Sequence, residues 1–245
     1  MPVVLITGAA SGIGAATAQA FARGGDAVVL GDRNADGLRS VEAALIADGA
    51  DALAVPCDVR DETETGDLVR AAVGRHGRID VVCTIAGLFV GPERPLEQTD
   101  DTVIDQLFEV NVKGVIHVLR PSIPHLSTGG SVILTSSISG LLAHPGGVVY
   151  AASKTAQIGL ARSLAAELAP RRIRVNVICP GTIDTPMAHA AHTPSQLEGF
   201  AAANPLGRLG RPEDVAAAFL FLARAEYVNG MALRVDGGDC LLGAL

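Results

Sequence analysis

The chain has 245 residues, 49% of them hydrophobic, which is enough to build the core of one large α/β domain or of two small ones. Its formal net charge of -7 and aromatic content of 3% argue against nucleic acid as a partner, because nucleic-acid surfaces call for positive charge and stacking side chains. The N-terminal stretch MPVVLITGAASGIG has no basic region, and its apolar run is only as long as a strand. We therefore expect no membrane span, no membrane partner and a cytoplasmic location.

The cysteines and histidines do not form the pattern of a disulfide framework or a metal site. Three of the four cysteines lie in apolar runs, and all are far apart: Cys57, Cys83, Cys179 and Cys240. We predict that they are thiols of the core. His189 and His192 have a helical spacing, but no carboxylate or third histidine completes a set of ligands, so no metal ion is expected.

Short runs rich in Val and Ile alternate with longer stretches that carry apolar residues at helical spacing. We predict strands at residues 3–7, 27–30, 52–57, 80–84, 131–136, 173–178 and 231–235. We predict helices at 12–24, 34–48, 61–76, 100–126 and 149–169, and one more that begins at Pro212. This alternation predicts an α/β fold with a doubly wound, parallel, seven-stranded sheet and helices on both faces, which is Rossmann-like. Because no flexible linker or repeat divides the chain, residues 1–245 are predicted to form a single domain.

The stretch 181–209 is the least regular part of the sequence. It contains Pro186, Pro194 and Pro205 and has no strand pattern. Loops of this length in compact domains are commonly lids or binding segments, so we expect that role here. The alternative is a surface excursion without a function.

The first predicted strand runs into a glycine-rich turn, TGAASGIG at 7 to 14, after which a helix begins. Glycine lets the backbone turn tightly and approach a pyrophosphate, whose charge is stabilised by the free amides and dipole of the helix N-terminus. The absence of Gly-Lys-Ser/Thr argues against a kinase-type P-loop. Asp32 ends the second strand about twenty residues further on, where a carboxylate can accept hydrogen bonds from the adenosine ribose. The two features together favour a dinucleotide site over a glycine turn with a capping Asp.

Asp58 follows the third predicted strand, in the sequence PCDV. Its carboxylate can cap the helix that starts near residue 61, or it can accept a hydrogen bond from the amino group of an adenine. The sequence leaves both interpretations open.

Tyr150 and Lys154 belong to the sequence YAASK, although the chain has only two tyrosines and two lysines. They lie four residues apart at the start of a predicted helix, so both side chains project from one face. A free tyrosine has a pKa of about 10, which is too high for a base at neutral pH. A lysine charge roughly 5 Å away, at an effective dielectric near 20, lowers this pKa by about two. We therefore predict that the pair performs acid/base chemistry.

Two further polar residues are placed to join this pair. Ser137 stands at the end of the fifth predicted strand, the edge of a doubly wound sheet where ligands bind, and its hydroxyl can hold a substrate oxygen. Asn111 lies well inside a predicted helix, where Asn is mildly unfavourable, and is therefore a candidate for a specific role. Taken singly, Ser137 is better explained as a strand-end cap and Asn111 as a solvated helix residue.

Taken together, these residues resemble the short-chain dehydrogenase/reductase family in its compact single-domain form, over essentially the whole chain. The matching stretches are TGAASGIG at 7 to 14, DV at 58 to 59, AG at 86 to 87, YAASK at 150 to 154 and PGTIDTPM at 180 to 187, together with Asn111 and Ser137. The family often has Asn-Asn before the Ala-Gly, whereas this chain has Thr84 and Ile85. This departure bears on sheet stability and on one cofactor contact.

The resemblance implies a role for each residue of the catalytic set. Tyr150 would be the acid/base, and Lys154 would lower its pKa and hold the nicotinamide ribose. Ser137 would position the substrate oxygen, and Asn111 would anchor a proton-relay water. Besides Tyr150 and Lys154, the implied cofactor contacts are Gly8, Ser11, Gly12, Ile13, Gly14, Asp32, Asp58, Val59, Ala86, Gly87, Ile183 and Thr185.

By this resemblance, we expect an oxidoreductase that transfers a hydride between NAD(H) and a secondary alcohol or its ketone. One alternative is an NADPH-dependent reductase of 3-oxoacyl thioesters, and another is a non-catalytic dinucleotide-binding sensor. The carboxylate of Asp32 argues against the first alternative, because it would repel the extra phosphate of NADP. The complete catalytic set argues against the second.

The residues predicted to flank the catalytic set are mostly apolar: Leu88, Phe89, Leu141, Leu142, His144 and Met187. A pocket of this kind favours a medium-sized, largely apolar small-molecule substrate, because polar groups buried without partners cost about 1 to 3 kcal/mol each. His144 can recognise an acidic group or serve only as a loop residue. The family commonly pairs its two long helices between subunits, so the helices predicted at 100–126 and 149–169 imply a homotetramer.

Overall fold

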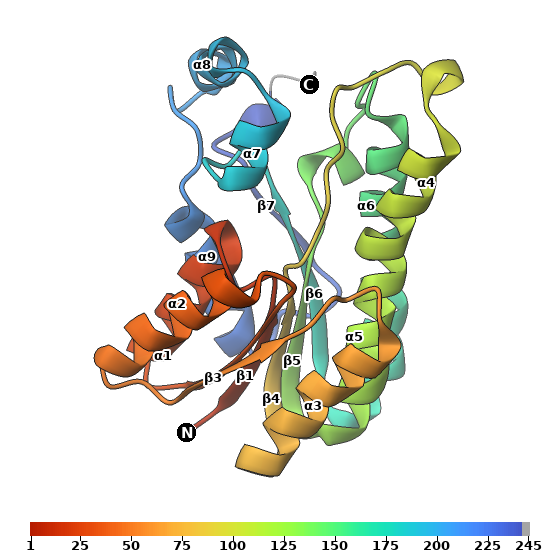
Figure 1. The fold of residues 1–245 in the computed structure, drawn as a ribbon. Coiled ribbons are helices and arrows are strands. Elements are labelled where there is room, and N and C mark those ends of the chain that lie inside the picture. Colours follow the sequence, from red (N-terminus) through yellow and green to blue (C-terminus); the bar gives the residue numbers. More distant parts are fainter. Residues whose placement is uncertain (242–245) are drawn as a thin grey trace.

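The computed structural model describes residues 1–241, which build a seven-stranded sheet in the order β3-β2-β1-β4-β5-β6-β7 (Figure 1). Every neighbouring pair of strands is parallel. The strands are β1 (Val3–Thr7), β2 (Ala27–Asp32), β3 (Ala52–Pro56), β4 (Ile79–Thr84), β5 (Leu126–Thr135), β6 (Arg174–Pro180) and β7 (Ala232–Val235). The predicted Rossmann-like fold is confirmed, although β5 begins five residues before its predicted start at residue 131. Since the strand order changes direction between β1 and β4, a ligand crevice is expected at their carboxyl ends.

Helices cover both faces of the sheet (Figure 1). One face carries α1 (Gly12–Arg23), α2 (Ala35–Ala47) and α9 (Pro212–Arg224). The other carries α3 (Glu62–His76), α5 (Gly114–Ser122) and α6 (Val148–Glu167), and α4 (Asp101–Phe108) continues the line of α5. None of the helices among residues 1–241 combines the length and apolar character needed to cross a bilayer.

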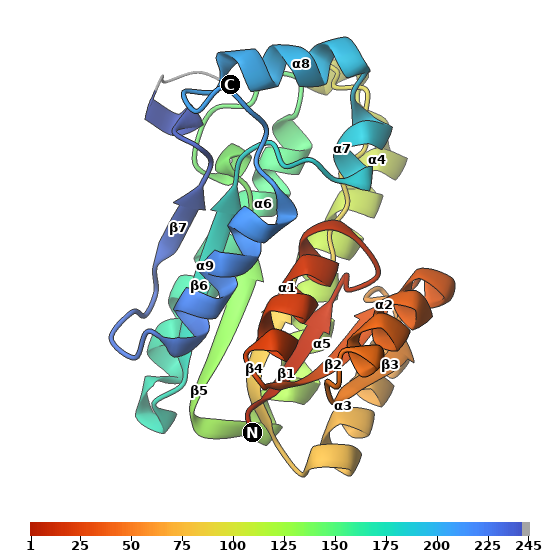
Figure 2. The same cartoon turned by 90° about the vertical axis from the view of Figure 1, so that its left-hand side faces the viewer.

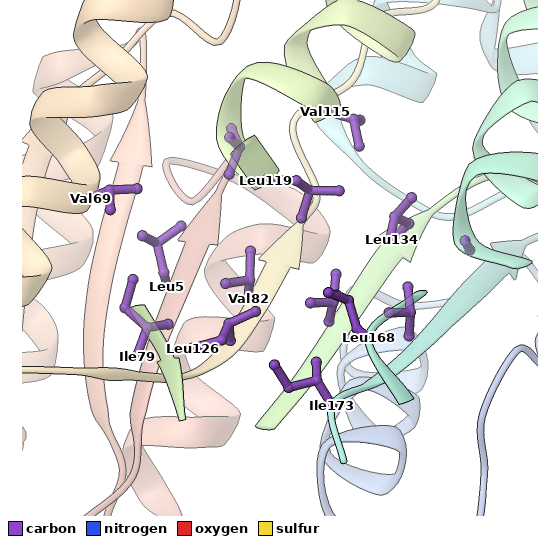
Figure 3. Close-up of a cluster of buried hydrophobic side chains, with 14 of the residues drawn as sticks. Leu5, Val69, Ile79, Val82, Val115, Leu119, Leu126, Leu134, Leu168 and Ile173 are labelled. Carbon is purple, nitrogen blue, oxygen red and sulfur yellow. The ribbon is translucent and has the colours of Figure 1, made fainter. Parts of the chain in front are cut away.

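The core is divided by the sheet into two apolar layers. Figure 3 shows the layer in which Leu5, Val82 and Leu134 of the central strands meet Val69 of α3 and Leu119 of α5. All five are buried. Because a parallel sheet covered on both faces exposes neither side, its strands are continuous apolar runs, which explains why they could be located in the sequence.

The predicted helix at 100–126 is interrupted by a widened turn. After α4 ends, residues Glu109–Lys113 form a π-helical turn, in which the amide of Gly114 bonds to the carbonyl oxygen of Glu109. Such turns are rare and often lie at functional sites. Asn111 lies in this turn, so its helix-disfavouring amide coincides with a break in regular α-helical bonding.

The expectation of an irregular segment at 181–209 is wrong for much of its length. It contains α7 (Pro186–Ala191) and α8 (Pro194–Ala203), which lie beyond the carboxyl ends of the strands (Figure 2). Pro186 and Pro194 each begin a helix, a position at which proline is well tolerated because its missing N–H would be unpaired there. The threonine before each of them caps the helix with its side chain.

All four cysteines are free thiols. Cys57, Cys83 and Cys179 are buried, as predicted for core residues, whereas Cys240 is partly exposed.

Candidate active site

The turn between β1 and α1 has no room for side chains at two of its glycines. A Cβ atom on Gly8 would lie 2.7 Å from the amide nitrogen of Ala86, and one on Gly14 would lie 2.0 Å from the carbonyl oxygen of Gly8. Gly8 also has a φ of 73°, in the left-handed region. The turn therefore packs tightly against the loop that follows β4.

The N-terminus of α1 is free to hold an anion. Its N-cap residue, Ser11, makes no side-chain capping bond, and the first turn contains no acidic residue. The helix dipole and the free amides of this turn are the donors that a pyrophosphate requires. This donor set fits the phosphates of a dinucleotide.

A cavity of about 200 Å³ opens in front of this helix terminus. It is lined by residues from the ends of β1, β2, β3 and β4 and from the segment before α7. Most of the predicted cofactor contacts lie in its wall, namely Gly8, Ser11, Gly12, Ile13, Gly14, Asp32, Asp58, Val59, Ala86, Gly87 and Thr185. Ile183 is instead buried, and a Cβ atom on Gly210 would lie 2.3 Å from its Cδ1.

The carboxylate of Asp32 is held by two backbone amides. Its Oδ2 accepts from the nitrogen of Ala10 at 3.1 Å, and its Oδ1 accepts from the nitrogen of Asn34 at 2.8 Å. These bonds fix the carboxylate between the glycine turn and the end of β2. Arg33 lines the same cavity.

The structure excludes the capping interpretation of Asp58, because Asp61 is the residue that caps α3. The side chain of Asp61 accepts from the amides of Thr63 and Glu64. Asp58 lines the cavity and pairs with Arg60, whose Nη2 lies 2.6 Å from Oδ2. The hydrogen bond from Arg60 lowers the pKa of the Asp58 carboxyl.

Asn111 is fully buried and joins three segments of the site. Its Oδ1 accepts from the nitrogen of Leu88 at 2.8 Å, and its Nδ2 donates to the carbonyl oxygen of Leu88 and to Oγ of Ser153. Its own carbonyl oxygen accepts from Nε2 of Gln157 at 2.8 Å. Ser153 and Gln157 were not predicted from the sequence. The available signal was their spacing of three and seven residues from Tyr150, which places three polar groups on one face of α6.

Lys154 is buried and connects the tyrosine with the cavity. Its Nζ donates to the carbonyl oxygen of Thr135 at 3.0 Å and lies 5.7 Å from the ring centroid of Tyr150. The same nitrogen is 3.3 Å from the position that a Cβ atom on Gly87 would occupy. Burial lowers the pKa of Lys154 to about 8, and the nearby thiol of Cys179 acts in the opposite direction. The ammonium group therefore reaches the cavity wall while remaining largely charged at neutral pH.

The predicted lowering of the tyrosine pKa is not observed in this structure. Burial raises the pKa of Tyr150 to about 12, and a hydrogen bond with Ser137 opposes this rise. The Coulomb argument from the sequence omitted desolvation, which disfavours a phenolate in a covered site. The Ser137 hydroxyl is itself oriented by Ser139, whose amide donates to it at 3.1 Å.

The residues predicted to contact substrate do not all lie together. Leu88 and Met187 line the cavity of about 200 Å³, whereas Leu141 is 40% exposed. The imidazole of His144 lies 2.5 Å from Oε1 of Glu93 through its Nε2, and its Nδ1 is buried.

The pair of histidines considered as metal ligands is also separated. His189 lies 2.6 Å from Oδ1 of Asp184, and His192 packs against aromatic rings. Among residues 1–241 there is no cluster of three or more side chains suited to a metal ion.

A column of aromatic rings, which the sequence did not predict, connects Tyr150 with α8. Phe89 packs edge-on against Tyr150, with ring centroids 4.9 Å apart, and contacts His192 at 5.6 Å. His192 in turn lies 5.1 Å from Phe200. These contacts join segments that are far apart in the chain, so no local sequence pattern predicts them.

A parallel sheet, a glycine turn before a helix terminus that can hold an anion, and a Tyr-Lys pair on one helix face are typical of dinucleotide-dependent oxidoreductases. Residues 8–239 match a family model described as Enoyl-(Acyl carrier protein) reductase. The chain belongs to the short-chain dehydrogenase/reductase family, whose members bind a nicotinamide dinucleotide.

Relatives of this chain are described as acting on different substrates. The chain is 39% identical to the 3-oxoacyl-[acyl-carrier-protein] reductase FabG of Thermotoga maritima, over 96% of each chain. It is 40% identical to a cis-4-hydroxycyclohexanecarboxylate dehydrogenase of Sinomonas cyclohexanicum, over 96% of this chain and 95% of the relative. The crystal structure of an actinorhodin polyketide ketoreductase variant with NADPH is similar to this structure with a TM-score of 0.91, at 31% identity over 97% of both chains.

Proposed function

We propose that this protein oxidises a secondary alcohol, or reduces the corresponding ketone, with NAD(H) as the cofactor. The observation that carries the proposal is the position of Tyr150 between the hydroxyl of Ser137 and the ammonium of Lys154. Lys154 also reaches Gly87 in the wall of the proposed cofactor cavity. A binding protein without activity has no need for such a set.

In the oxidation direction, Tyr150 as phenolate takes the proton of the alcohol hydroxyl while the carbinol hydrogen leaves with its electron pair. The bound nicotinamide ring supplies the hydride acceptor. Ser137 holds the substrate oxygen beside the phenol, and Lys154 stabilises the phenolate charge. Asn111 keeps the loop after β4 fixed to α6 through Ser153, which holds the cavity wall against the catalytic helix.

The preference for NAD rests on Asp32. Its carboxylate is fixed at the end of β2, where the adenosine ribose lies in this fold, and it would repel a phosphate on that ribose. Two considerations oppose this preference: Arg33 lines the same cavity and can pair with a phosphate, and a relative of known structure binds NADPH. We expect discrimination of about tens to hundreds-fold in kcat/KM in favour of NAD. Equal efficiency with both cofactors would refute the role of Asp32.

We propose that the substrate is of medium size and largely apolar. Two of the predicted substrate contacts, Leu88 and Met187, line the proposed cofactor cavity, and their apolar side chains support this class. The name of the dehydrogenase from Sinomonas cyclohexanicum adds support for a cyclic secondary alcohol, although that substrate also carries a carboxylate. The test compares kcat/KM for a cyclic alcohol, an aryl-alkyl alcohol, a sugar alcohol and 3-hydroxybutyrate. An advantage of tenfold or more for either of the last two, which is about 1.4 kcal/mol, would refute the apolar-pocket reasoning.

A second candidate is NADPH-dependent reduction of 3-oxoacyl thioesters. The description of the matching family model and the identity to the Thermotoga maritima reductase favour it. The discriminating assay is the reduction of an acetoacetyl thioester with NADPH, compared with the reduction of a cyclic ketone with NADH. A higher kcat/KM for the thioester would favour this second candidate.

We also propose that the chain forms a homotetramer through α4, α5 and α6. Phe108 at the end of α4 is 36% exposed, and Val148 at the start of α6 is 45% exposed, and a subunit contact would remove this apolar surface from water. Light scattering at micromolar concentration tests the proposal, and a monomer would refute it.

A further inference from the structure

Two cavities lie on either side of a thin wall in the candidate active site. The first is the proposed cofactor cavity of about 200 Å³. The second has a volume of about 140 Å³, lies beside Tyr150 and is bordered by Gly146 and Gly147. Among residues 1–241, no residue lines both.

Two chain segments form the wall between the two cavities, because each contributes residues to both linings. Leu88 lines the cofactor cavity, and the next residue, Phe89, lines the second. On the neighbouring helical segment, Val110 lines the cofactor cavity and Leu107 the second. Of these, Phe89 carries the ring that touches the catalytic tyrosine.

Phe89 is held on both sides by aromatic rings. Its ring is edge-on to Tyr150, and its other neighbour is His192, which follows α7. The edge-on arrangement of Phe89 and Tyr150 is one that aromatic pairs prefer, because the positive edge of one ring meets the negative face of the other. The backbone approaches closely at the same place, because a Cβ atom on Gly91 would lie 3.3 Å from the carbonyl oxygen of Ala191. The ring is therefore a fixed part of the wall rather than a freely rotating side chain.

We propose that Phe89 determines the size of the substrate. Its ring blocks the cavity beside Tyr150, so that the part of the substrate beyond the reacting carbon cannot enter it. The inference rests on the proposed function, since it takes Tyr150 as the group that touches the substrate oxygen. With Phe89 in place, the enzyme accepts a substrate that ends at the ring. Without the ring, the two spaces join. The added volume accepts an apolar extension of the substrate on the side lined by Val103, Leu107 and Val149, whereas Gln98, Thr99 and Asp100 line the cavity elsewhere.

The test compares the binding of cyclohexanone and 4-phenylcyclohexanone to the protein saturated with oxidised cofactor. A ketone and an oxidised cofactor do not react, so calorimetry gives the dissociation constants independently of turnover. We expect Phe89→Ala to improve the binding of the phenyl-substituted ketone relative to cyclohexanone by tenfold or more. Phe89→Leu, which keeps much of the volume and removes the ring, should change the ratio less. Phe221→Ala on α9, where Phe221 is 54% exposed, is the matched control and should leave the ratio unchanged.

Each outcome of this experiment decides the question. The proposal is supported only if the ratio rises in Phe89→Ala while the affinity for the cofactor itself stays within twofold of wild type. A ratio unchanged within twofold, or failure of the larger ketone to bind the Ala variant, overturns it. If the wild type binds both ketones but oxidises neither cyclohexanol nor any other alcohol, the proposed function is wrong. The ratio of the two dissociation constants still tests the role of Phe89 in that case.

Discussion

Replacing Asp32 by Asn tests the cofactor site most directly, because it removes one charge and changes little of the shape. In the structure, both carboxylate oxygens accept backbone amides, from Ala10 and from Asn34. An asparagine side chain has only one oxygen, so one of these amides loses its acceptor. We expect the oxygen to stay on Ala10, whose amide is partly buried, and the exposed amide of Asn34 to bond to water.

The size of the effect follows from the distance between like charges. A phosphate about 4 Å from a carboxylate, at an effective dielectric of 20, is repelled by about 4 kcal/mol. Asp32 is only half-buried, and Arg33 on the cavity wall offsets part of the repulsion, so we expect about 1.4 to 2.8 kcal/mol. This corresponds to a shift of about ten- to a hundredfold in the ratio of kcat/KM for NAD to that for NADP, in favour of NADP.

The assay measures kcat/KM with both cofactors for the wild type and for Asp32→Asn, at a fixed alcohol concentration and at two ionic strengths. Asp36→Asn is the matched control, because Asp36 lies in the first turn of α2, is exposed and is absent from the cavity wall. The control should leave the ratio unchanged. If Asp32→Asn changes the ratio by less than threefold, or if the control changes it equally, the electrostatic reasoning is wrong.

Three further outcomes are expected at residues of the candidate active site. Tyr150→Phe should lower turnover by a hundredfold or more while the cofactor still binds, since it removes only the transferable proton; retention of more than about a tenth of the wild-type rate would refute its role. Because oxidation needs the phenolate and the Tyr150 pKa is raised to about 12, alcohol oxidation should accelerate from about pH 6 to 8, whereas ketone reduction should not. Above about pH 8 the loss of the Lys154 charge opposes this gain. The rate of oxidation would contradict this if it did not change with pH while a deuterium isotope effect showed that hydride transfer limits the rate. Gln157→Leu removes the donor to the Asn111 carbonyl together with an unpaired buried oxygen, so we expect kcat to fall about fivefold or more, with KM and thermal stability nearly unchanged. If the variant also melts at a clearly lower temperature than the wild type, the loss of kcat would reflect a purely structural role.

The parts of the molecule that follow from local rules were predictable from the sequence. The strands are apolar because both faces of the sheet are covered. The turn after β1 contains glycines because there is no space for a side chain at Gly8 and Gly14. Asp32 could be placed at the end of β2 because strand length and spacing fix that position. These features depend on neighbours in the chain, which a single sequence records.

The parts that depend on contacts between distant segments were not predictable. Pro186 and Pro194 do not by themselves indicate that α7 and α8 begin there, because the capping threonines become meaningful only once a helix is assumed. The contact of Phe89 with His192 joins two loops, and the bond from Gln157 to Asn111 depends on a π-helical turn that has no sequence signature. The interpretation of His144 as a substrate contact likewise could not anticipate its pairing with Glu93.

The pKa of the catalytic tyrosine shows why residue spacing alone does not determine chemistry. The spacing of Tyr150 and Lys154 correctly places both on one face of α6, but the same burial that brings them together raises the pKa of the phenol and lowers that of the amine. Both shifts favour neutral forms, so the chain's own lysine does not by itself ionise the tyrosine. Without further positive charge the phenol stays protonated, which is the form required to donate a proton to a ketone. Oxidation of an alcohol therefore requires additional positive charge near the hydroxyl, and an oxidised nicotinamide ring, once bound, would supply it.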